Sequence, residues 1–141
     1  MSHNKNEITL LLIEDDDIDA MAIRRALGKA NIGNNLIRAC DGFEALEMLR
    51  NDTVPSPFVI LLDLQMPRLN GLEFLEEIRN DPTLDKSTVF VLTTSKSDED
   101  ITASYKKNIA GYFVKDQVGE EFFDIVKMLK GYWKIVLFPE N

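Results

Sequence analysis

Five short apolar runs, separated by segments with helical spacing, constrain the fold of this chain more than any other feature. The runs lie at residues 8–13, 36–39, 58–62, 89–92 and 112–114. Short apolar runs bounded by polar residues indicate buried strands, and strands that alternate with helical segments indicate βαβ units. The sequence therefore predicts an α/β domain with a five-stranded parallel sheet, right-handed crossovers and helices on both faces.

The helical segments place most of their apolar residues three or four positions apart, which is the spacing of one helix face. Asn70 is expected to cap the third helix, and Ser97 with Asp100 resembles a capping box before the fourth. Asp41-Gly42 is typical of a turn. The residues that define the predicted faces are Ile18, Met21, Ala22, Arg25 and Leu27; Phe43, Leu46 and Leu49; Leu72, Leu75 and Ile78; Ile101 and Tyr105; and Phe122, Ile125, Val126, Leu129 and Trp133.

The length of 141 residues fits one domain. We predict a disordered N-terminus at 1–7, the domain at 8–131 and an apolar tail at 132–141. Residues 1–7 lack the apolar core of a signal peptide, and no apolar run approaches the roughly 18 residues of a membrane span. Cys40 is the single cysteine, which favours a reducing compartment. We therefore expect a cytoplasmic protein.

The charge balance argues against some classes of partner. The chain has 24 acidic and 16 basic residues, a formal net charge of −8. Nucleic-acid binding needs a basic face, and attraction to an anionic membrane surface also needs basic residues. We expect neither nucleic acid nor membrane as the main partner.

Polar residues follow four of the five apolar runs at the point where each run ends. Glu14-Asp15-Asp16 follows the first run, Asp63 the third, Thr93-Thr94-Ser95 the fourth and Lys115 the fifth. Ligands of open parallel sheets gather outside the carboxyl ends of the strands. We therefore expect these side chains to meet in one site.

The residue types at these strand ends suit phosphoryl transfer. Clustered carboxylates need a positive partner to stay ionised, and oxygen ligands without His or Cys suit a hard cation such as Mg²⁺. A carboxylate, here Asp63, can attack phosphorus to give an aspartyl phosphate, a reaction that depends on positioning and charge neutralisation. Lys115 can supply positive charge, and the Thr93 hydroxyl can donate to a phosphoryl oxygen.

Each of these residues also has a purely structural interpretation. The acidic run can be a solvated loop that favours the dipole of the next helix, and we assign Asp17 and Asp19 to that role. Asp63 taken singly can be a turn former, Thr93 a β-forming residue and Lys115 a surface lysine. Their joint occurrence in this order favours the functional interpretation.

These motifs resemble the response regulator receiver domains of two-component signalling, over about residues 8–130. The resemblance implies a flavodoxin-like fold with strand order 2-1-3-4-5. It also implies a signalling phosphoprotein that catalyses only its own phosphorylation and dephosphorylation. The segments that carry it are Glu14-Asp15; Leu62-Asp63-Leu64-Gln65-Met66-Pro67 followed by Asn70-Gly71; Thr93-Thr94-Ser95; and Ala110-Gly111-Tyr112-Phe113-Val114-Lys115.

The resemblance implies a phosphoacceptor and a metal site. Asp63 would accept the phosphoryl group from the phosphohistidine of a sensor histidine kinase or a histidine phosphotransfer protein. Asp15 and Asp63 would bind Mg²⁺ through their carboxylates, Gln65 through its backbone carbonyl and Glu14 through a water molecule.

The resemblance also implies how phosphorylation is sensed. Thr93 and Lys115 would hold the phosphoryl oxygens, and Tyr112 would turn inward when Thr93 is drawn toward the phosphate. The family usually has proline after this lysine, whereas this chain has Asp116. A cis bond before a non-proline residue costs about 2.5–4 kcal/mol, so either the strain is retained or the loop after the fifth strand differs.

The apolar tail is similar to that of stand-alone receivers that serve bacterial phytochrome-type kinases, which are often dimers. Exposed apolar residues mark contact sites, so Trp133, Val136, Leu137 and Phe138 are candidate dimer contacts. The alternative is a tail that folds onto its own core. With no DNA-binding output domain expected, the output would be a change in protein contacts.

Three other functions fit parts of the pattern. A hydrolase of the haloacid dehalogenase type also forms an aspartyl phosphate, but it needs a second acid where this chain has Gln65. A flavodoxin-like cofactor binder needs a phosphate loop where this chain has four acids, which would repel phosphate without a metal. A pseudo-receiver would bind partners without phosphorylation, which the full set of acids, Thr93 and Lys115 disfavours.

Overall fold

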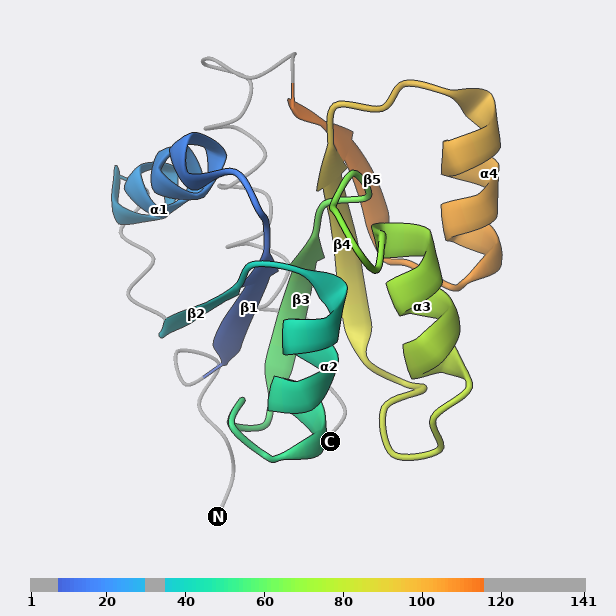
Figure 1. Cartoon of the computed structure of the whole chain (residues 1–141). Helices are drawn as coiled ribbons and strands as arrows, with labels where there is room; N and C mark the ends of the chain where they lie inside the picture. The colour runs from blue at the N-terminus through green and yellow to red at the C-terminus, as the bar shows by residue number, and fades with distance from the viewer. Residues whose placement is uncertain (1–7, 30–34, 116–141) are drawn as a thin grey trace.

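The computed structural model describes residues 8–29 and 35–115. Its parallel strands pair in the order β2-β1-β3-β4-β5 (Figure 1). This order and the strand positions confirm the sequence prediction, with strand ends that differ by one residue at most. The strands are β1 (Thr9–Ile13), β2 (Leu36–Ala39), β3 (Phe58–Leu62), β4 (Thr88–Thr93) and β5 (Gly111–Val114).

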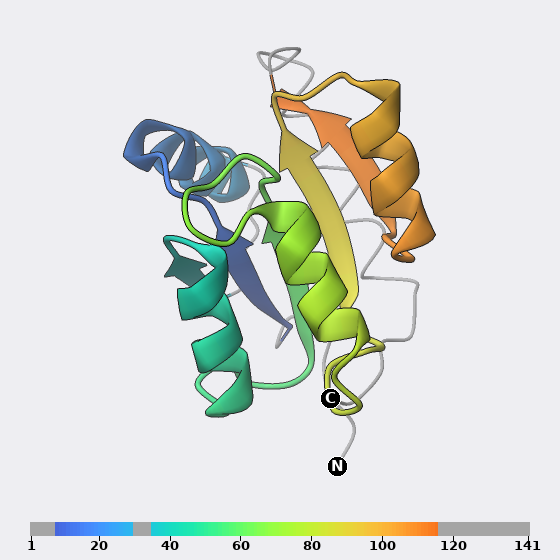
Figure 2. The same cartoon turned by 45° about the vertical axis from the view of Figure 1, so that its right-hand side comes forward.

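Helices cover both faces of this sheet, as predicted. The described helices are α1 (Asp17–Lys29), α2 (Gly42–Arg50), α3 (Gly71–Arg79) and α4 (Asp98–Lys106). Helix α1 lies on one face, while α2, α3 and α4 lie side by side on the other (Figures 1 and 2). None of the helices within the described residues is long and apolar enough to cross a membrane.

Two hydrophobic cores fill the spaces between the sheet and these helices. Leu10 and Leu12 of β1 pack with Ile23 on the α1 side, whereas Leu11 and Ile13 belong to the cluster on the α2 and α3 side. Successive side chains of a strand point to opposite faces, and both faces are covered here. Every residue of β1 and β3 is therefore buried, which explains why these strands read as continuous apolar runs.

The helix starts show how local sequence positions the elements. Asn70 caps α3 in a full capping box with Glu73, and the Ser97 side chain accepts a hydrogen bond from the Asp100 N–H at the start of α4. Both N-caps confirm the prediction, but the capping box expected at Ser97 is incomplete, because the Asp100 carboxylate accepts from the Ser95 hydroxyl. The Asp41-Gly42 pair, predicted as a turn, is instead the start of α2, because the Asp41 side chain accepts from the Glu44 N–H.

The buried face of α1 differs from the predicted one. Ile18 and Met21 were expected to face the core but are 78% and 53% exposed. The face against the sheet consists of Ala20, Ile23, Ala26 and Leu27. These residues also lie three or four positions apart, so the sequence of α1 contains two apolar stripes. The stripe with the two alanines is the one that packs against the strands.

Two aromatic residues that were also predicted on buried helix faces, Tyr105 and Phe43, are about half exposed. Tyr105 of α4 is 50% exposed, and the buried residue of that helix is Ser104. Phe43 of α2 is 49% exposed, and the Arg68 guanidinium lies 5.1 Å from its ring centroid. The structure confirms α2 and α4 as helices, but these two side chains were assigned to the wrong surface.

Gly71 sets the start of α3 directly against the chain that follows β3. Its N–H donates to the Leu64 carbonyl at 3.0 Å. A Cβ at this position would lie 2.6 Å from Leu64 Cα and 2.7 Å from the Asp63 carbonyl oxygen. Only glycine permits this close approach, and the approach fixes the backbone beside Asp63.

Arg79, at the end of α3, joins this helix to the end of α4. Its Nε donates to the Lys107 carbonyl at 2.7 Å, one Nη to the Ser87 carbonyl at 2.8 Å and the other to the Asn108 carbonyl at 3.1 Å. Burial lowers the pKa of Arg79 below its usual value. The guanidinium thus satisfies several carbonyls that follow α4 and precede β4.

Several predictions concern residues outside the described ranges of the chain. These are the disordered N-terminus at 1–7, the last helix around residues 122–133, the apolar tail at 132–141 and the loop at Asp116.

Candidate functional site

The carboxyl ends of the parallel strands lie at one edge of the sheet (Figure 1). Predicted site residues end or directly follow β1, β3, β4 and β5, so they lie at this edge. Glu14 directly follows β1, and its N–H donates to the Ala39 carbonyl at 3.0 Å. Asp63 directly follows β3, and its N–H donates to the Ile13 carbonyl at 3.1 Å. The sheet hydrogen bonding thus extends one residue beyond the strands and fixes the backbone of both acids.

Three carboxylates meet at this edge. Glu14, Asp15 and Asp63 each offer an oxygen, and these oxygens all lie within 4.8 Å of one another. Glu14 and Asp63 are buried, at 1% and 5% exposure, whereas Asp15 is exposed. The cluster therefore combines two buried acids with one that is open to solvent.

Lys115, which follows β5, supplies the positive charge inside the cluster. Its Nζ donates to the Glu14 carboxylate in a close ion pair. It also donates to Asp63 Oδ2 at 3.2 Å and to Asp19 Oδ2 at 2.9 Å. The Lys115 side chain is 9% exposed, so one buried ammonium is shared by three carboxylates.

The electrostatics of the site favour a further cation. Burial raises the pKa of Glu14 to about 7, with the Lys115 hydrogen bond acting against this and the Asp63 charge adding to it. Burial alone would lower the pKa of Lys115, yet its hydrogen bonds to Glu14 and Asp19 and the Asp63 charge raise it above its usual value. Lys115 is therefore charged, and it is the one ammonium that the described residues place among the carboxylates of Glu14, Asp15, Asp19 and Asp63.

The side chains of this cluster fit a divalent cation. The donor set is made of carboxylate oxygens, which suit a hard cation such as Mg²⁺ or Mn²⁺. Gln65 lies beside them, because its N–H donates to Asp63 Oδ1 at 3.1 Å. The Gln65 side chain points elsewhere: its amide oxygen accepts a hydrogen bond from the Thr94 hydroxyl.

Thr93, Ser95 and Tyr112 form a second group beside the carboxylates. Thr93 ends β4 and is fully buried, and its hydroxyl oxygen accepts from the Ser95 N–H at 3.5 Å. The Tyr112 hydroxyl donates to the Ser95 carbonyl at 2.9 Å, and burial raises the pKa of Tyr112. The Ser95 hydroxyl donates to Asp100, so this group links the end of β4 to the first turn of α4.

Sequence reasoning missed two residues that contact the site. Asp19 was assigned to solvent, yet it pairs with Lys115 at 2.9 Å. Arg38 was not considered, yet its Nε donates to the Glu14 carbonyl at 2.9 Å and its Nη1 to Asp17 at 2.7 Å. Asp19 lies in the first turn of α1, which begins next to the end of β1, and that position was the available signal.

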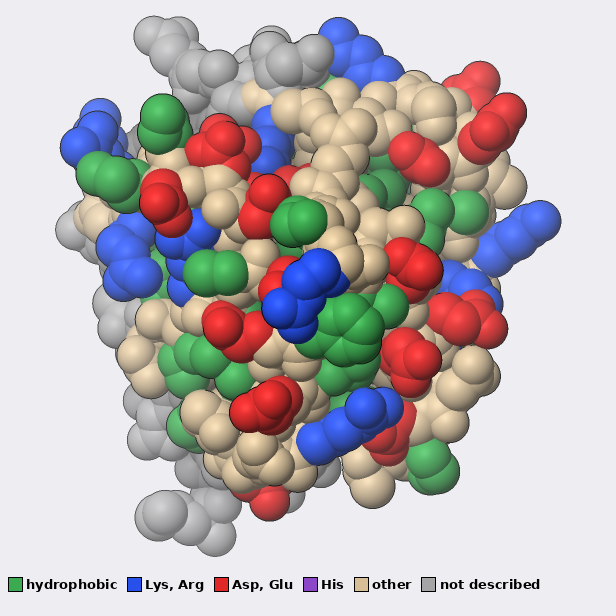
Figure 3. Space-filling view, viewed as in Figure 1, with side chains coloured by type: hydrophobic (Ala, Val, Ile, Leu, Met, Phe, Trp, Pro, Cys, Tyr) green, Lys and Arg blue, Asp and Glu red, His purple; other side chains and the backbone are tan. Residues whose placement is uncertain are grey.

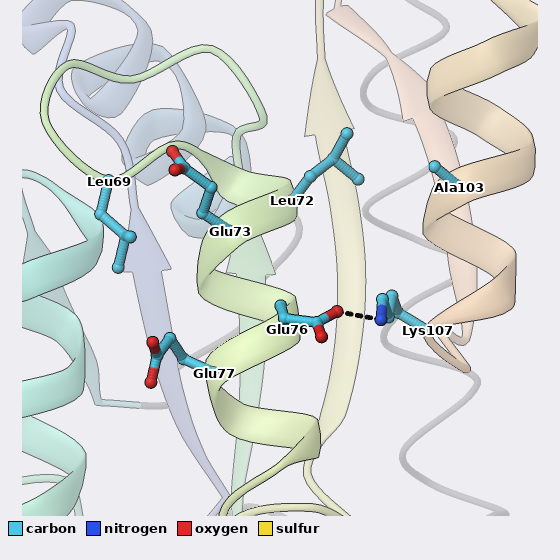
Figure 4. A pocket seen from close by; sticks show the side chains of 7 residues that line it. All are labelled: Leu69, Leu72, Glu73, Glu76, Glu77, Ala103 and Lys107. Atoms are coloured by element: carbon cyan, nitrogen blue, oxygen red, sulfur yellow. Dashed lines mark hydrogen bonds and ion pairs between the residues drawn. The ribbon is translucent and has the colours of Figure 1, made fainter.

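Figure 4 shows a groove between α3 and α4, and the residues that line it do not include those of the carboxylate cluster. It measures about 430 Å³ and is lined by Leu69, Leu72, Glu73, Glu76, Glu77, Ala103 and Lys107. Its charged residues are paired within the protein, for example Glu76 with Lys107. The same face carries scattered acidic side chains (Figure 3), in line with the net charge of −8.

Residues 10–127 match the family model of the response regulator receiver domain. Among curated proteins, the chain is 34% identical over 128 residues to the response regulator Rcp1 of a Synechocystis strain, covering 88% of this chain and 87% of that protein.

Solved structures agree with this match. The Mn²⁺-bound form of Rcp1 is 33% identical, with a TM-score of 0.83 over 94% of this chain and 99% of that one. The phosphorylated cyanobacterial phytochrome response regulator RcpA is 33% identical, with a TM-score of 0.85 over 95% of this chain and 99% of that one.

Proposed function

The chain belongs to the response regulator receiver family, and we propose that it accepts a phosphoryl group on Asp63 during two-component signalling. One observation carries this proposal: Glu14, Asp15 and Asp63 converge within 4.8 Å, and Lys115 reaches Asp63 from the far edge of the sheet. Receiver domains take the phosphoryl group from a histidine kinase or a histidine phosphotransfer protein, and we infer the same class of donor here.

Mg²⁺ is the cofactor we propose for this cluster. The carboxylates of Asp15 and Asp63 and the backbone carbonyl of Gln65 would hold the ion, with Glu14 acting through water. When bound, the ion neutralises charge on the entering phosphoryl group. The exposed position of Asp15 beside two buried acids supports a site that is open on one side.

The transfer itself is a displacement at phosphorus. An Asp63 carboxylate oxygen forms the new bond to phosphorus, and the bond from phosphorus to the donor imidazole nitrogen breaks, with its electron pair staying on that nitrogen. Lys115 would stabilise the phosphoryl oxygens as a point charge. Thr93 would donate a hydrogen bond to one of them after transfer.

We infer that phosphorylation is read by the group around Ser95. Movement of Thr93 toward the phosphate would displace the Ser95 backbone, whose N–H contacts Thr93 and whose carbonyl accepts from Tyr112. Both Tyr112 and the first turn of α4 would then change position. Such a two-state change alters which surface is presented to a partner.

Compartment, output and assembly stay predictions. We expect the protein to act in the cytoplasm and to signal through protein contacts. A homodimer that uses Trp133, Val136, Leu137 and Phe138 involves residues outside the described ranges.

The decisive experiment is intact-mass analysis after incubation with acetyl phosphate and Mg²⁺. The wild-type chain should gain one phosphoryl group, and Asp63→Asn should gain none. Asp85→Asn, an exposed acid remote from the cluster, is the matched control and should label like wild type. Full labelling of Asp63→Asn would refute the assignment.

The same preparation separates this function from a phosphatase. A hydrolase of the haloacid dehalogenase type needs a second acid two residues after the nucleophile. This chain has Gln65 there, and the Gln65 side chain accepts a hydrogen bond from Thr94. We therefore expect no sustained release of phosphate from a phosphomonoester such as p-nitrophenyl phosphate. Multiple turnovers would favour the hydrolase.

A further inference from the structure

We propose that Asp19 is a positioning residue, which holds the Lys115 ammonium on α1 when a divalent cation binds the carboxylate cluster. Lys115 contacts three carboxylates, and two of them, Glu14 and Asp63, also belong to the cluster. Asp19 belongs to α1 and lies outside the cluster. The inference rests on the proposed metal site and adds a residue to it.

The Lys115 ammonium and a divalent ion would compete for the carboxylate oxygens of Glu14 and Asp63. In the metal-free arrangement, Lys115 takes up the negative charge of Glu14 and Asp63. A divalent ion that binds those acids would repel an ammonium a few ångströms away. Within the described residues, Asp19 is the remaining carboxylate in hydrogen-bond contact with Nζ, at 2.9 Å. It therefore gives the ammonium a partner that the metal does not take.

The start of α1 holds Asp19 in place for this role. The Asp16 side chain accepts from the N–H of Ile18 at 2.8 Å and from the N–H of Asp19 at 3.0 Å. This cap fixes the first turn of the helix, and Ile23 packs the next turn against the sheet. The Asp19 side chain is 41% exposed, so its contact with the ammonium is partly open to solvent.

Without Asp19, the described carboxylates in contact with the Lys115 ammonium would be Glu14 and Asp63, which also belong to the proposed metal site. Asp19→Asn should therefore weaken divalent binding, because binding would now leave Lys115 unpaired. Exposed ion pairs are worth about 1 kcal/mol or less, so the expected loss of affinity is about fivefold.

The test measures the dissociation constant of Mn²⁺ for the 141-residue chain by isothermal titration calorimetry. Asp17→Asn is the matched control, because it removes one charge from the same helical turn. Its carboxylate pairs with Arg38 and is 85% exposed. Both substitutions are also made in a Lys115→Met background, which removes the ammonium.

Three results are expected. Asp19→Asn weakens Mn²⁺ binding by about fivefold, Asp17→Asn changes it by less than about twofold, and the Asp19→Asn effect disappears in the Lys115→Met background. Equal effects of Asp19→Asn and Asp17→Asn would overturn the proposal. An undiminished Asp19→Asn effect without Lys115 would also overturn it, since Asp19 would then act on the metal directly.

A metal-free measurement tests the contact itself. The NMR signals of the Lys115 side chain should shift in Asp19→Asn and stay unchanged in Asp17→Asn, and an unchanged spectrum in both would overturn the proposal.

The failure of this proposal can be told apart from the failure of the proposed function. If wild type binds Mn²⁺ and is labelled by acetyl phosphate while Asp19→Asn behaves as Asp17→Asn, only the role of Asp19 fails. If wild type binds no Mn²⁺, the proposed function fails as well.

Discussion

Among the described acids, Glu14 has the environment that is most unfavourable to its charge. Its side chain is 1% exposed and lies beside Asp63. Among the described residues, the Lys115 ammonium and the Asp16 N–H donate hydrogen bonds to its carboxylate. A buried carboxylate with a raised pKa binds its proton more tightly in the folded state than in the unfolded chain. Glu14 therefore makes the stability of the metal-free protein depend on pH.

The sign of this dependence follows from the pKa of about 7, against an ordinary value of 4.5. Between these values the folded state holds more protons than the unfolded state, so stability falls as pH rises. Lys115 contributes nothing in this window because its raised pKa lies far above it.

We expect the metal-free wild type to lose on the order of 2 kcal/mol relative to Glu14→Gln between pH 5 and pH 8. Urea unfolding of both proteins in a chelator at several pH values measures this difference. A difference that grows in the opposite direction would show that Glu14 is stabilised as the carboxylate.

Sequence reasoning could place Asp63, Thr93 and Lys115 at one edge because strand ends are readable from apolar runs. It could not place Asp19, because a helical acid faces solvent or the site according to the rotation of the helix. That rotation is set by packing, and the sequence of α1 offers two apolar stripes. The roles of the site residues remain predictions that the labelling experiment tests.

At the scale of elements, α3 and α1 show opposite uses of glycine. Gly71 begins α3 against Leu64, where a Cβ would lie 2.6 Å from a backbone atom. Gly28 lies near the end of α1, where a Cβ would meet nothing within 4 Å. The first glycine is required by packing, and the second costs the helix conformational entropy.

Alanine at each position should therefore act in opposite directions. Gly71→Ala should lower the free energy of unfolding by about 1–3 kcal/mol, because backbone must move to admit the methyl group. Gly28→Ala should raise it by roughly 0.5–1 kcal/mol. Urea denaturation midpoints measure both, and a neutral Gly71→Ala would mean that α3 can shift away from Leu64 without cost.

Element boundaries were predictable where local signals were strong. Asn70 and Ser97 marked the starts of α3 and α4, since each side chain caps its helix through local hydrogen bonds. Helix faces were less predictable, as Ile18 and Met21 show. Amphipathic spacing defines a stripe, but contact with the sheet decides which stripe is buried.

At the scale of the whole molecule, the cluster concentrates negative charge in a fold that already has a net charge of −8. A divalent cation that binds only the folded state should stabilise it by mass action. At 100 times the dissociation constant, the gain is about 2.7 kcal/mol.

Thermal unfolding with Mg²⁺ and with a chelator measures this gain. Asp15→Asn should reduce it, because it removes the exposed ligand and leaves the buried pair Glu14 and Lys115 in place. Asp85→Asn, distant from the cluster, should keep the full gain. Equal melting temperatures of the wild type in Mg²⁺ and in chelator would argue against a metal site at these acids.

The Arg79 guanidinium has a mechanical consequence for α4. It bonds the carbonyls of Lys107 and Asn108 at the C-terminal end of that helix, whereas the N-terminal end is joined to the end of β4 through Ser95 and Asp100. The Arg79 hydrogen bonds hold the C-terminal end of α4 in place, so a rigid-body movement of this helix is a rotation about that end. If the hydrogen bond between Ser95 and Asp100 opens, we expect the first turn of α4 to move more than the last turn, so the displacement is greatest at the end of the helix that is joined to β4.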